Sequence, residues 1–210
     1  TGMPVSASWA FMASGMDWPA MSSRRSRVTR AAETFVKERP LLAGASSGLS
    51  GTGSTETGPV TVDDAAVFTA RFTSGALGTF EATRYATGRK NSLQVELNGE
   101  LGSLAFDLER LNELSFHDET EPAVTSGFRR ILVTEPEHPY LEGWWPPGHG
   151  LGYDHTFVHQ ARDLVHAVAA GTSPAPSFAD GLRVQRVLAA VEESAAKNAV
   201  YTPVPDLEAS

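Results

Sequence analysis

The chain has 210 residues, enough to bury a sizeable apolar core, and its 41 % hydrophobic and 20 % charged residues are ordinary for a folded protein. Its 17 basic against 25 acidic side chains give a formal net charge of -8, the wrong sign for neutralising a phosphate backbone, so we expect no nucleic-acid binding. There is no cysteine, no apolar run of roughly 20 residues that could span a bilayer and no signal-peptide pattern, so we expect a cytoplasmic protein without disulfides or membrane contact.

Residues 1–58 show clear periodicity only in short stretches, such as 5–11 and 28–36. Between these stretches lies a basic, serine-rich run at residues 22–27. Such a run inside an acidic protein is typical of an exposed loop. We therefore expect residues 1–58 to form an irregular segment with short strands.

Residues 44–51 read Gly-Ala-Ser-Ser-Gly-Leu-Ser-Gly, which superficially resembles the phosphate-cradling turn of short-chain dehydrogenases. Such a turn must follow a buried strand and open a helix, so that the helix N-terminus faces the pyrophosphate. Here Pro40 precedes the segment and further glycines and serines follow it. We interpret it as a flexible surface loop and expect no cofactor-binding residue on this chain.

From about residue 60 apolar and polar residues alternate, which is the period of a half-buried strand. The predicted strands are residues 66–72, 77–84, 93–97, 104–108, 114–116 and 130–134, with a last short strand at 201–204. Thr73-Ser74-Gly75 predicts a turn between the first two. Asn98-Gly99 favours a second hairpin turn, because both residues tolerate positive φ.

Two helices follow the strands. Phe157, Ala161 and Leu164 begin an apolar stripe at helical spacing, and Gly171 lies where a helix C-cap is expected. Ser177 and Asp180 resemble a capping box that opens the second helix. This order predicts an α+β fold, an open-faced, mostly antiparallel sheet of about five or six strands with helices covering one face. We assign it to residues 59–206, followed by a tail at 207–210.

The loop at residues 144–157 is rich in aromatic residues and glycine and leads directly into the first predicted helix. Its candidate ligand-binding residues are Trp144, Trp145, His149 and Tyr153, which could stack on a sugar ring and hydrogen-bond its hydroxyls. The alternative is that both tryptophans plug the sheet edge, and the sequence leaves the two readings open. Arg84 is a further candidate, because an arginine at the end of an inward-facing strand pattern must be paired or line a cleft.

Other chemistries find little support. His149, His155 and His159, with Glu142 or Asp154, are a weak metal-binding pattern, because histidines near a helix start more often cap the helix or hydrogen-bond. No Gly-x-Ser-x-Gly elbow indicates a serine hydrolase. We therefore expect no metal site.

Several segments together resemble a known family. They are Asp63-Asp64-Ala65-Ala66, the strand at residues 75–84, Asn98-Gly99, the loop and helix start at 148–157, and Asp180-Gly181-Leu182. On these segments, residues 60–204 resemble the C-terminal domain of the Gfo/Idh/MocA oxidoreductases, and residues 34–40 are similar to the family strand that precedes the sheet.

The resemblance implies an N-terminal Rossmann domain that binds NAD or NADP, and a C-terminal sheet that shapes the substrate cleft and mediates homo-oligomers. It also implies hydride transfer at a sugar or polyol hydroxyl. The family's dinucleotide glycine motif, its Glu-Lys-Pro lysine and its later Asp and His have no counterpart in this chain, so we expect no catalytic residue on it. The cofactor domain is then missing or carried by a separate Rossmann-domain polypeptide.

The segment before the sheet suggests one further hypothesis. If G+C-rich codons are assigned to residues 14–26, a displaced reading frame gives Gly-His-Gly-Leu-Ala-Arg-Tyr-Val-Val-Ser-Pro-Ile, which resembles the family helix that carries the histidine. Residues 1–58 would then include a frame-shifted remnant, and the gene sequence tests this. We expect the substrate-binding half of an NAD(P)-dependent oxidoreductase, inactive alone; the alternative is a non-catalytic sugar-binding or dimerisation module.

Overall fold

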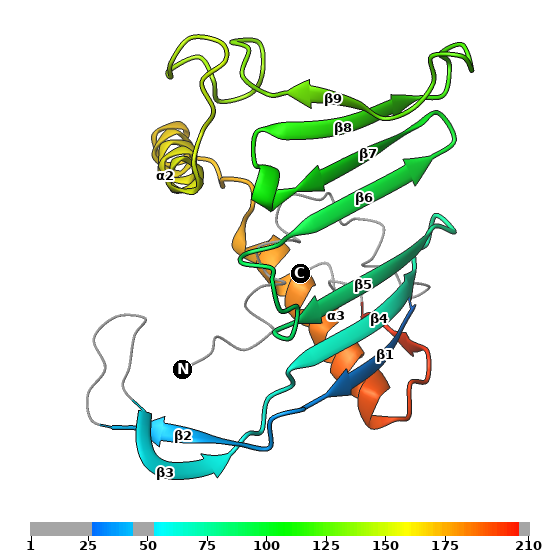
Figure 1. Cartoon of the computed structure of the whole chain (residues 1–210), viewed down its shortest axis with the longest axis vertical. Coiled ribbons are helices and arrows are strands. Elements are labelled where there is room, and N and C mark those ends of the chain that lie inside the picture. The colour runs from blue at the N-terminus through cyan, green and yellow to red at the C-terminus, as the bar shows by residue number, and fades with distance from the viewer. Residues whose placement is uncertain (1–26, 44–52, 206–210) are drawn as a thin grey trace. The chain divides into compact units, whose positions relative to one another are not determined.

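The computed structural model describes residues 27–43 and 53–205 (Figure 1). The reading-frame hypothesis for residues 14–26, nearly all of the basic run and the glycine-rich loop at 44–51 lie outside these residues. Contacts divide the chain into two units, Thr1–Thr87 with Ala175–Ser210, and Gly88–Pro174, here called unit 1 and unit 2. Antiparallel strands and two long helices confirm the α+β class, with the strands distributed over three sheets.

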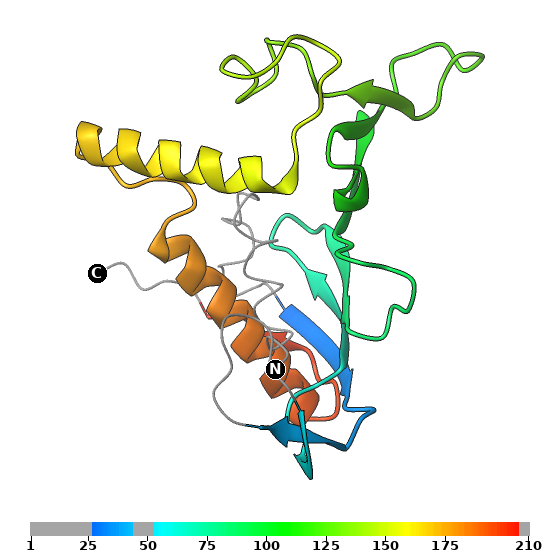
Figure 2. The same ribbon diagram turned by 60° about the vertical axis from the view of Figure 1, so that its left-hand side comes forward.

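Unit 1 is built on a four-stranded antiparallel sheet in the order β10-β1-β4-β5. Its strands are β1 (Arg27–Glu33), β4 (Ala65–Arg71), β5 (Leu77–Thr83) and β10 (Thr202–Pro203). Helix α3 (Phe178–Ala196) lies along one face (Figure 2). The buried core between sheet and helix consists of Val28, Phe68, Ala70, Ala190, Val191 and Val204.

The alternation of β4 follows from this burial. Ala66, Phe68 and Ala70 face α3 and are buried, whereas Val67 is 50 % exposed on the opposite face. The rings of Phe68 and Phe80 stack at 4.5 Å between paired strands. The cap prediction for α3 is confirmed, because the Ser177 hydroxyl and the Asp180 carboxylate each accept a hydrogen bond from the other's main-chain N–H.

Strand β1 lies within the segment that the sequence analysis treated as irregular. It pairs with β4 along its whole length, with Val28 opposite Ala70. Its inward-facing positions include Arg30, which is buried and forms an ion pair with Asp63. Most of this strand falls in the periodic stretch at residues 28–36 of the sequence.

A separate two-stranded ribbon joins β2 (Glu38–Leu42) and β3 (Gly53–Pro59). Asp64 ties the chain before this ribbon to the start of β4. Its carboxylate is fully buried, accepts a hydrogen bond from the Val36 N–H at 2.9 Å and forms an ion pair with Arg39. The Val36 N–H bond and the Arg39 charge hold the pKa of Asp64 below its usual value.

Unit 2 is built on a four-stranded antiparallel meander, β6-β7-β8-β9. Its elements are β6 (Gln94–Gly99), β7 (Gly102–Asp107), the 3-10 turn η1 (Leu108–Arg110), β8 (Glu113–Asp118), β9 (Arg129–Leu132) and helix α2 (Tyr153–Ala170). Helix α2 ends at Gly171 in the left-handed conformation, φ 66°, as the sequence predicted. The first hairpin turns at residues 100–101, two residues later than predicted, because Gly99 pairs with Gly102. Gly102 is required there, since a Cβ would lie 2.3 Å from the His117 carbonyl oxygen.

The helices in the described ranges have no stretch that is both long and apolar enough to cross a membrane.

Candidate functional site: the aromatic loop of unit 2

Residues 135–152, here called the aromatic loop, connect β9 to helix α2. Trp144 lies at its centre and packs against the helix. The indole ring meets the His155 ring edge-on at 4.4 Å, and Nε1 donates a hydrogen bond to Nε2 of His159 at 2.7 Å. Both polar and apolar parts of the ring are therefore engaged by α2.

Tyr140 makes a second attachment to the same side of α2. Its ring stacks on His159 at 4.7 Å, and its hydroxyl donates to a carboxylate oxygen of Asp163 at 2.6 Å. The backbone of Tyr140 is left-handed, φ 69°, a strained conformation that persists only where surrounding contacts hold it. The hydrogen bond to Asp163 raises the pKa of the Tyr140 hydroxyl.

His159 is held as a neutral ring. Since the Trp144 N–H can only donate, Nε2 of His159 must accept, and the ring proton lies on Nδ1. Burial lowers the pKa of His159, and the nearby His155 and Arg162 lower it further, against an opposing effect of Asp163. His155 in turn accepts a hydrogen bond from the Gly152 N–H and so caps the helix start.

Trp145 and His149 lie on the outer part of the loop. Trp145 is 74 % exposed, with its ring centre 6.0 Å from that of His149. Nδ1 of His149 lies 2.8 Å from the Pro146 carbonyl oxygen. Because a carbonyl can only accept, Nδ1 is the donor in this bond, and Nε2 is left to interact with a ligand hydroxyl.

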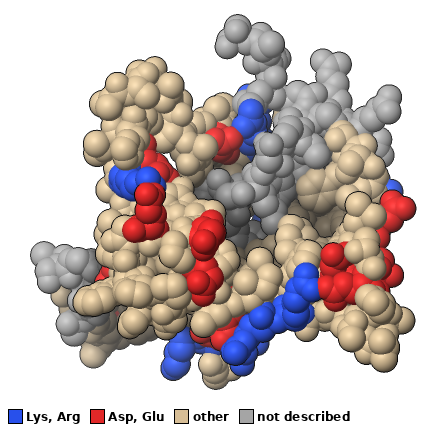
Figure 3. Space-filling model, turned by 90° about the horizontal axis from the view of Figure 1, so that it is seen from above, with Lys and Arg blue, Asp and Glu red and all other residues tan. Residues whose placement is uncertain are grey.

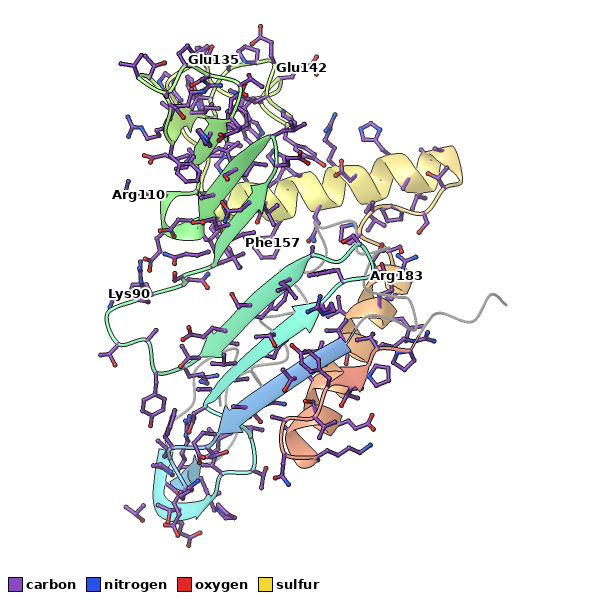
Figure 4. The ribbon with its side chains drawn as sticks, turned by 90° about the vertical axis from the view of Figure 1, so that its right-hand side faces the viewer. Lys90, Arg110, Glu135, Glu142, Phe157 and Arg183 are labelled. Atoms are coloured by element: carbon purple, nitrogen blue, oxygen red, sulfur yellow. The ribbon has the colours of Figure 1, made fainter. Side chains whose placement is uncertain are left out.

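Tyr153 begins α2 beside a shallow depression of about 490 Å³. Residues 108–113, Leu132 and residues 150–153 line it. The Tyr153 ring is nearly half exposed and packs edge-on against Phe157. Figure 4 shows Phe157 on the side of α2 away from Glu135 and Glu142 of the aromatic loop. Phe157 therefore lies on a different face of the helix from the one that contacts the loop.

Arg84, the remaining predicted site residue, belongs to unit 1. It directly follows β5, its main-chain N–H donates to the Asp64 carbonyl at 2.8 Å, and its charge contributes to lowering the pKa of Asp64. The structure thus places Trp144, Trp145, His149 and Tyr153 on one loop and helix start, and Arg84 in a different unit.

Within the described residues, no group of three or more histidine, aspartate or glutamate side chains is arranged to hold a metal ion. On the face seen in Figure 3 acidic and basic groups lie beside one another. The ion pairs of unit 2 include Arg129 with Glu121 and Arg130 with Glu113.

The sequence analysis missed Tyr140, Asp163 and Asn112 as parts of this region. Tyr140 and Asp163 lie 23 residues apart, and Asn112 reaches Leu151 across 39 residues. No spacing rule links residues at such separations, and a fixed contact between them is visible only in the fold.

Comparison with known proteins settles the family. The family model described as "Oxidoreductase family, C-terminal alpha/beta domain", GFO_IDH_MocA_C, matches residues 29–204. The chain belongs to the Gfo/Idh/MocA family of oxidoreductases. The match begins in β1, so it includes strands that precede the predicted boundary at residue 59.

The names of the relatives describe an activity more narrowly than the family description does. Levoglucosan dehydrogenase of Pseudarthrobacter phenanthrenivorans is 43 % identical over 188 residues, which are 88 % of this chain and 47 % of the relative. The crystal structure of an oxidoreductase domain protein from Kribbella flavida is 58 % identical, with a TM-score of 0.77 over 86 % of this chain and 44 % of that chain. A levoglucosan dehydrogenase complex with NADH and levoglucosan is 40 % identical, with a TM-score of 0.76 over 87 % of this chain and 45 % of that chain. The chain thus spans slightly less than half the length of these relatives.

That relative is in complex with NADH. A pyrophosphate site needs a glycine turn between a buried strand and a helix N-terminus. Helix α2 follows the aromatic loop, and α3 follows a proline-containing connection at residues 171–177. Neither helix in the described part of the chain fits the dinucleotide.

Proposed function

We propose that the chain is the substrate-binding half of an NAD(P)-dependent oxidoreductase that acts on a sugar or polyol hydroxyl group. The observation that carries this proposal is the 43 % identity to levoglucosan dehydrogenase over 88 % of the chain. Structures of that enzyme with NADH and levoglucosan, and with NADH and L-sorbose, supply the class of ligand. A fold alone does not determine the substrate, so the sequence identity is the observation that narrows the class of substrate.

Within unit 2 we assign ligand contact to Trp145, His149 and Tyr153, and Arg84 of unit 1 stays a separate prediction. The exposed Trp145 ring offers a face for the C–H groups of a sugar, and His149 and Tyr153 offer hydroxyl partners. Trp144 has a structural role instead, because its ring and its N–H are both engaged by α2. The contacts of Trp144 are with α2 and not with a sheet edge, and ligand contact is proposed for Trp145 alone.

Turnover requires a second component. Hydride transfer needs the nicotinamide carbon held against the substrate carbon, and neither described helix offers the pyrophosphate site that would position it. A dinucleotide-binding domain, in the same protein or on a separate polypeptide, therefore supplies the cofactor. We expect NAD or NADP there, no metal on this half and no turnover by this chain alone.

A second candidate is a non-catalytic sugar-binding or dimerisation module. The face of the unit 1 sheet opposite α3 favours it, because Val67 and Leu77 are 50 % and 68 % exposed there. A homo-oligomer formed through the sheet would cover such a face. This module and the oxidoreductase half differ in their requirement for a cofactor domain.

Calorimetry and a chimera separate these functions. The chain is titrated with levoglucosan and with L-sorbose, each with and without NADH. The chimera places the dinucleotide-binding half of levoglucosan dehydrogenase before this chain, and NADH formation is followed by absorbance. We expect sugar binding by the chain and sugar-dependent turnover only by the chimera. Sugar binding with an inactive chimera of normal stability would favour the module, and a chain without sugar binding would refute the proposed substrate role.

A further inference from the structure

Asn112 joins two parts of unit 2 that lie 39 residues apart. Its Nδ2 donates to the Leu151 carbonyl at 2.8 Å, and its Oδ1 accepts from the Leu151 N–H at 2.6 Å. The orientation of the amide is fixed, because a main-chain N–H can only donate and a carbonyl can only accept. A side chain thus makes the paired hydrogen bonds that a neighbouring strand would otherwise make to Leu151.

The backbone of Asn112 is anchored on the sheet. Its carbonyl accepts a hydrogen bond from the Val133 N–H at 2.8 Å, next to the β8–β9 pair of Glu113 and Leu132. The residue is half-buried. Asn112 directly precedes β8, and a group held at the end of a paired strand is positioned more accurately than one in the middle of a loop, so the amide is a rigid attachment point.

Gly150 shows how closely the loop approaches this amide. A Cβ at position 150 would lie 2.8 Å from Nδ2 and 3.1 Å from Cγ of Asn112. Every larger residue would therefore displace the amide. The absence of a side chain at Gly150 is explained by this close approach.

We propose that Asn112 is a positioning residue for the ligand-binding part of the aromatic loop. Its amide holds Leu151 against the start of β8, two residues before Tyr153 begins α2. Asn112 and Tyr153 line the same depression, so the Asn112 amide determines the position of the Tyr153 ring at this depression. The proposal rests on the proposed function only in assigning sugar contact to Tyr153.

The first test measures position without any ligand. Amide hydrogen exchange is compared between the unaltered chain, Asn112→Ala, Asn112→Asp and the control Asn98→Ala. Asn98 bonds to Glu96 and Ser103 on the β6–β7 hairpin of the same unit, away from the loop. We expect the Leu151 amide to exchange about tenfold faster in Asn112→Ala, with a smaller increase in Asn112→Asp, which keeps only the acceptor. Unchanged exchange at Leu151 would overturn the proposal.

A second variant guards against general loss of structure. If Asn112→Ala accelerates exchange in β7 as well as in the loop, Gly150→Ala decides, because its methyl group displaces the amide while Asn112 remains. Faster exchange confined to residues 150–153 supports positioning. If residues 150–153 still exchange slowly in Gly150→Ala, although the Asn112 amide is displaced, the positioning proposal is overturned.

The third measurement connects position to binding. Levoglucosan affinity by calorimetry is expected to fall about tenfold in Asn112→Ala and to stay unchanged in Asn98→Ala. Lost protection at Leu151 with unchanged affinity would make Asn112 a merely structural residue and overturn its positioning role. An unaltered chain that binds no sugar would refute the proposed function, while exchange at Leu151 would still decide whether Asn112 fixes the loop.

Discussion

Trp144 donates a hydrogen bond from Nε1 to Nε2 of His159 at 2.7 Å, which attaches the aromatic loop to the second turn of α2. The bond exists only while His159 is neutral, because a protonated ring has no acceptor at Nε2. The groups facing His159 are Tyr140 and Trp144 from the loop, and His155, Arg162 and Asp163 from the helix.

This contact predicts a loss of stability in mild acid. Because the pKa of His159 is lowered in the folded protein from an ordinary value of 6.5, the unfolded chain takes up the proton first. The stabilisation is complete above 6.5 and is lost as the pH falls through the lowered pKa. Urea unfolding at about pH 7.5 and about pH 5.5 should show this loss. His159→Gln keeps an acceptor for Trp144 and does not titrate, so its stability should depend less on pH in this range.

His117 provides a control of opposite sign. The hydrogen bond to Glu119 raises the pKa of His117, so its stabilisation is complete below 6.5 and is lost as the pH rises through the raised pKa. His117→Gln should therefore steepen the loss of stability toward acid, whereas His159→Gln flattens it. Equal effects of the two variants would contradict this assignment.

The second prediction concerns ligand contact at His149. His149→Ala should weaken levoglucosan binding about five- to tenfold and leave the thermal midpoint nearly unchanged, because the ring is exposed on the loop. His166 is a matched control, an exposed histidine on α2, and His166→Ala should change neither quantity. A large fall in the midpoint of His149→Ala would assign the residue to structure.

The third prediction tests strand β1. Val28 is fully buried between the sheet and α3, so Val28→Ala should lower the free energy of unfolding by about 2–3 kcal/mol. Val67, on the opposite face of the same sheet, is half exposed, and Val67→Ala should change it by less than about 0.5 kcal/mol. Equal losses measured by urea unfolding would refute the burial of Val28 in the core between β1 and α3.

The fourth prediction tests the buried carboxylate of Asp64. Asp64→Asn should lower the thermal midpoint by about 5 °C or more, because Arg39 loses its partner and the Val36 N–H loses a charged acceptor. Glu81→Gln is the control, since Glu81 is an exposed carboxylate on β5. The pKa of Asp64 is lowered, so its contribution is present above about 3.8 and is lost as the pH falls through the lowered pKa.

Periodicity predicted much of this fold. Strand β4 was readable because Ala66, Phe68 and Ala70 alternate cleanly between two faces, and the ends of the helices were readable because Gly171 and Ser177 have specific backbone roles. Strand β1 falls in the periodic stretch at residues 28–36, but its pairing with β4 and the ion pair of Arg30 with Asp63, 33 residues away, could not be predicted from the sequence. A local pattern predicts a strand, whereas its partner strand and a long-range ion pair are visible only in the fold.

The candidate loop was recognisable from its composition, but the roles of its residues were not. Trp144 and Trp145 are neighbours with similar side chains, yet one is bound to His159 and the other is largely exposed. The contact between Asn112 and Leu151 had no counterpart in spacing. The family resemblance was confirmed by the family model over residues 29–204. It could be recognised from the sequence because it rests on several short segments and needs no knowledge of long-range contacts.

Unit 1 is assembled from two stretches of chain with all of unit 2 between them. Val28 and Phe68 belong to the first stretch, and Val191 and Val204 to the second, so the core cannot close until the last of these has been synthesised. Unit 2 has all four of its strands and α2 by residue 174. On the ribosome unit 2 can thus fold first, while the inward face of β4 stays uncovered until α3 is made, and apolar surface exposed in this way favours aggregation and chaperone binding.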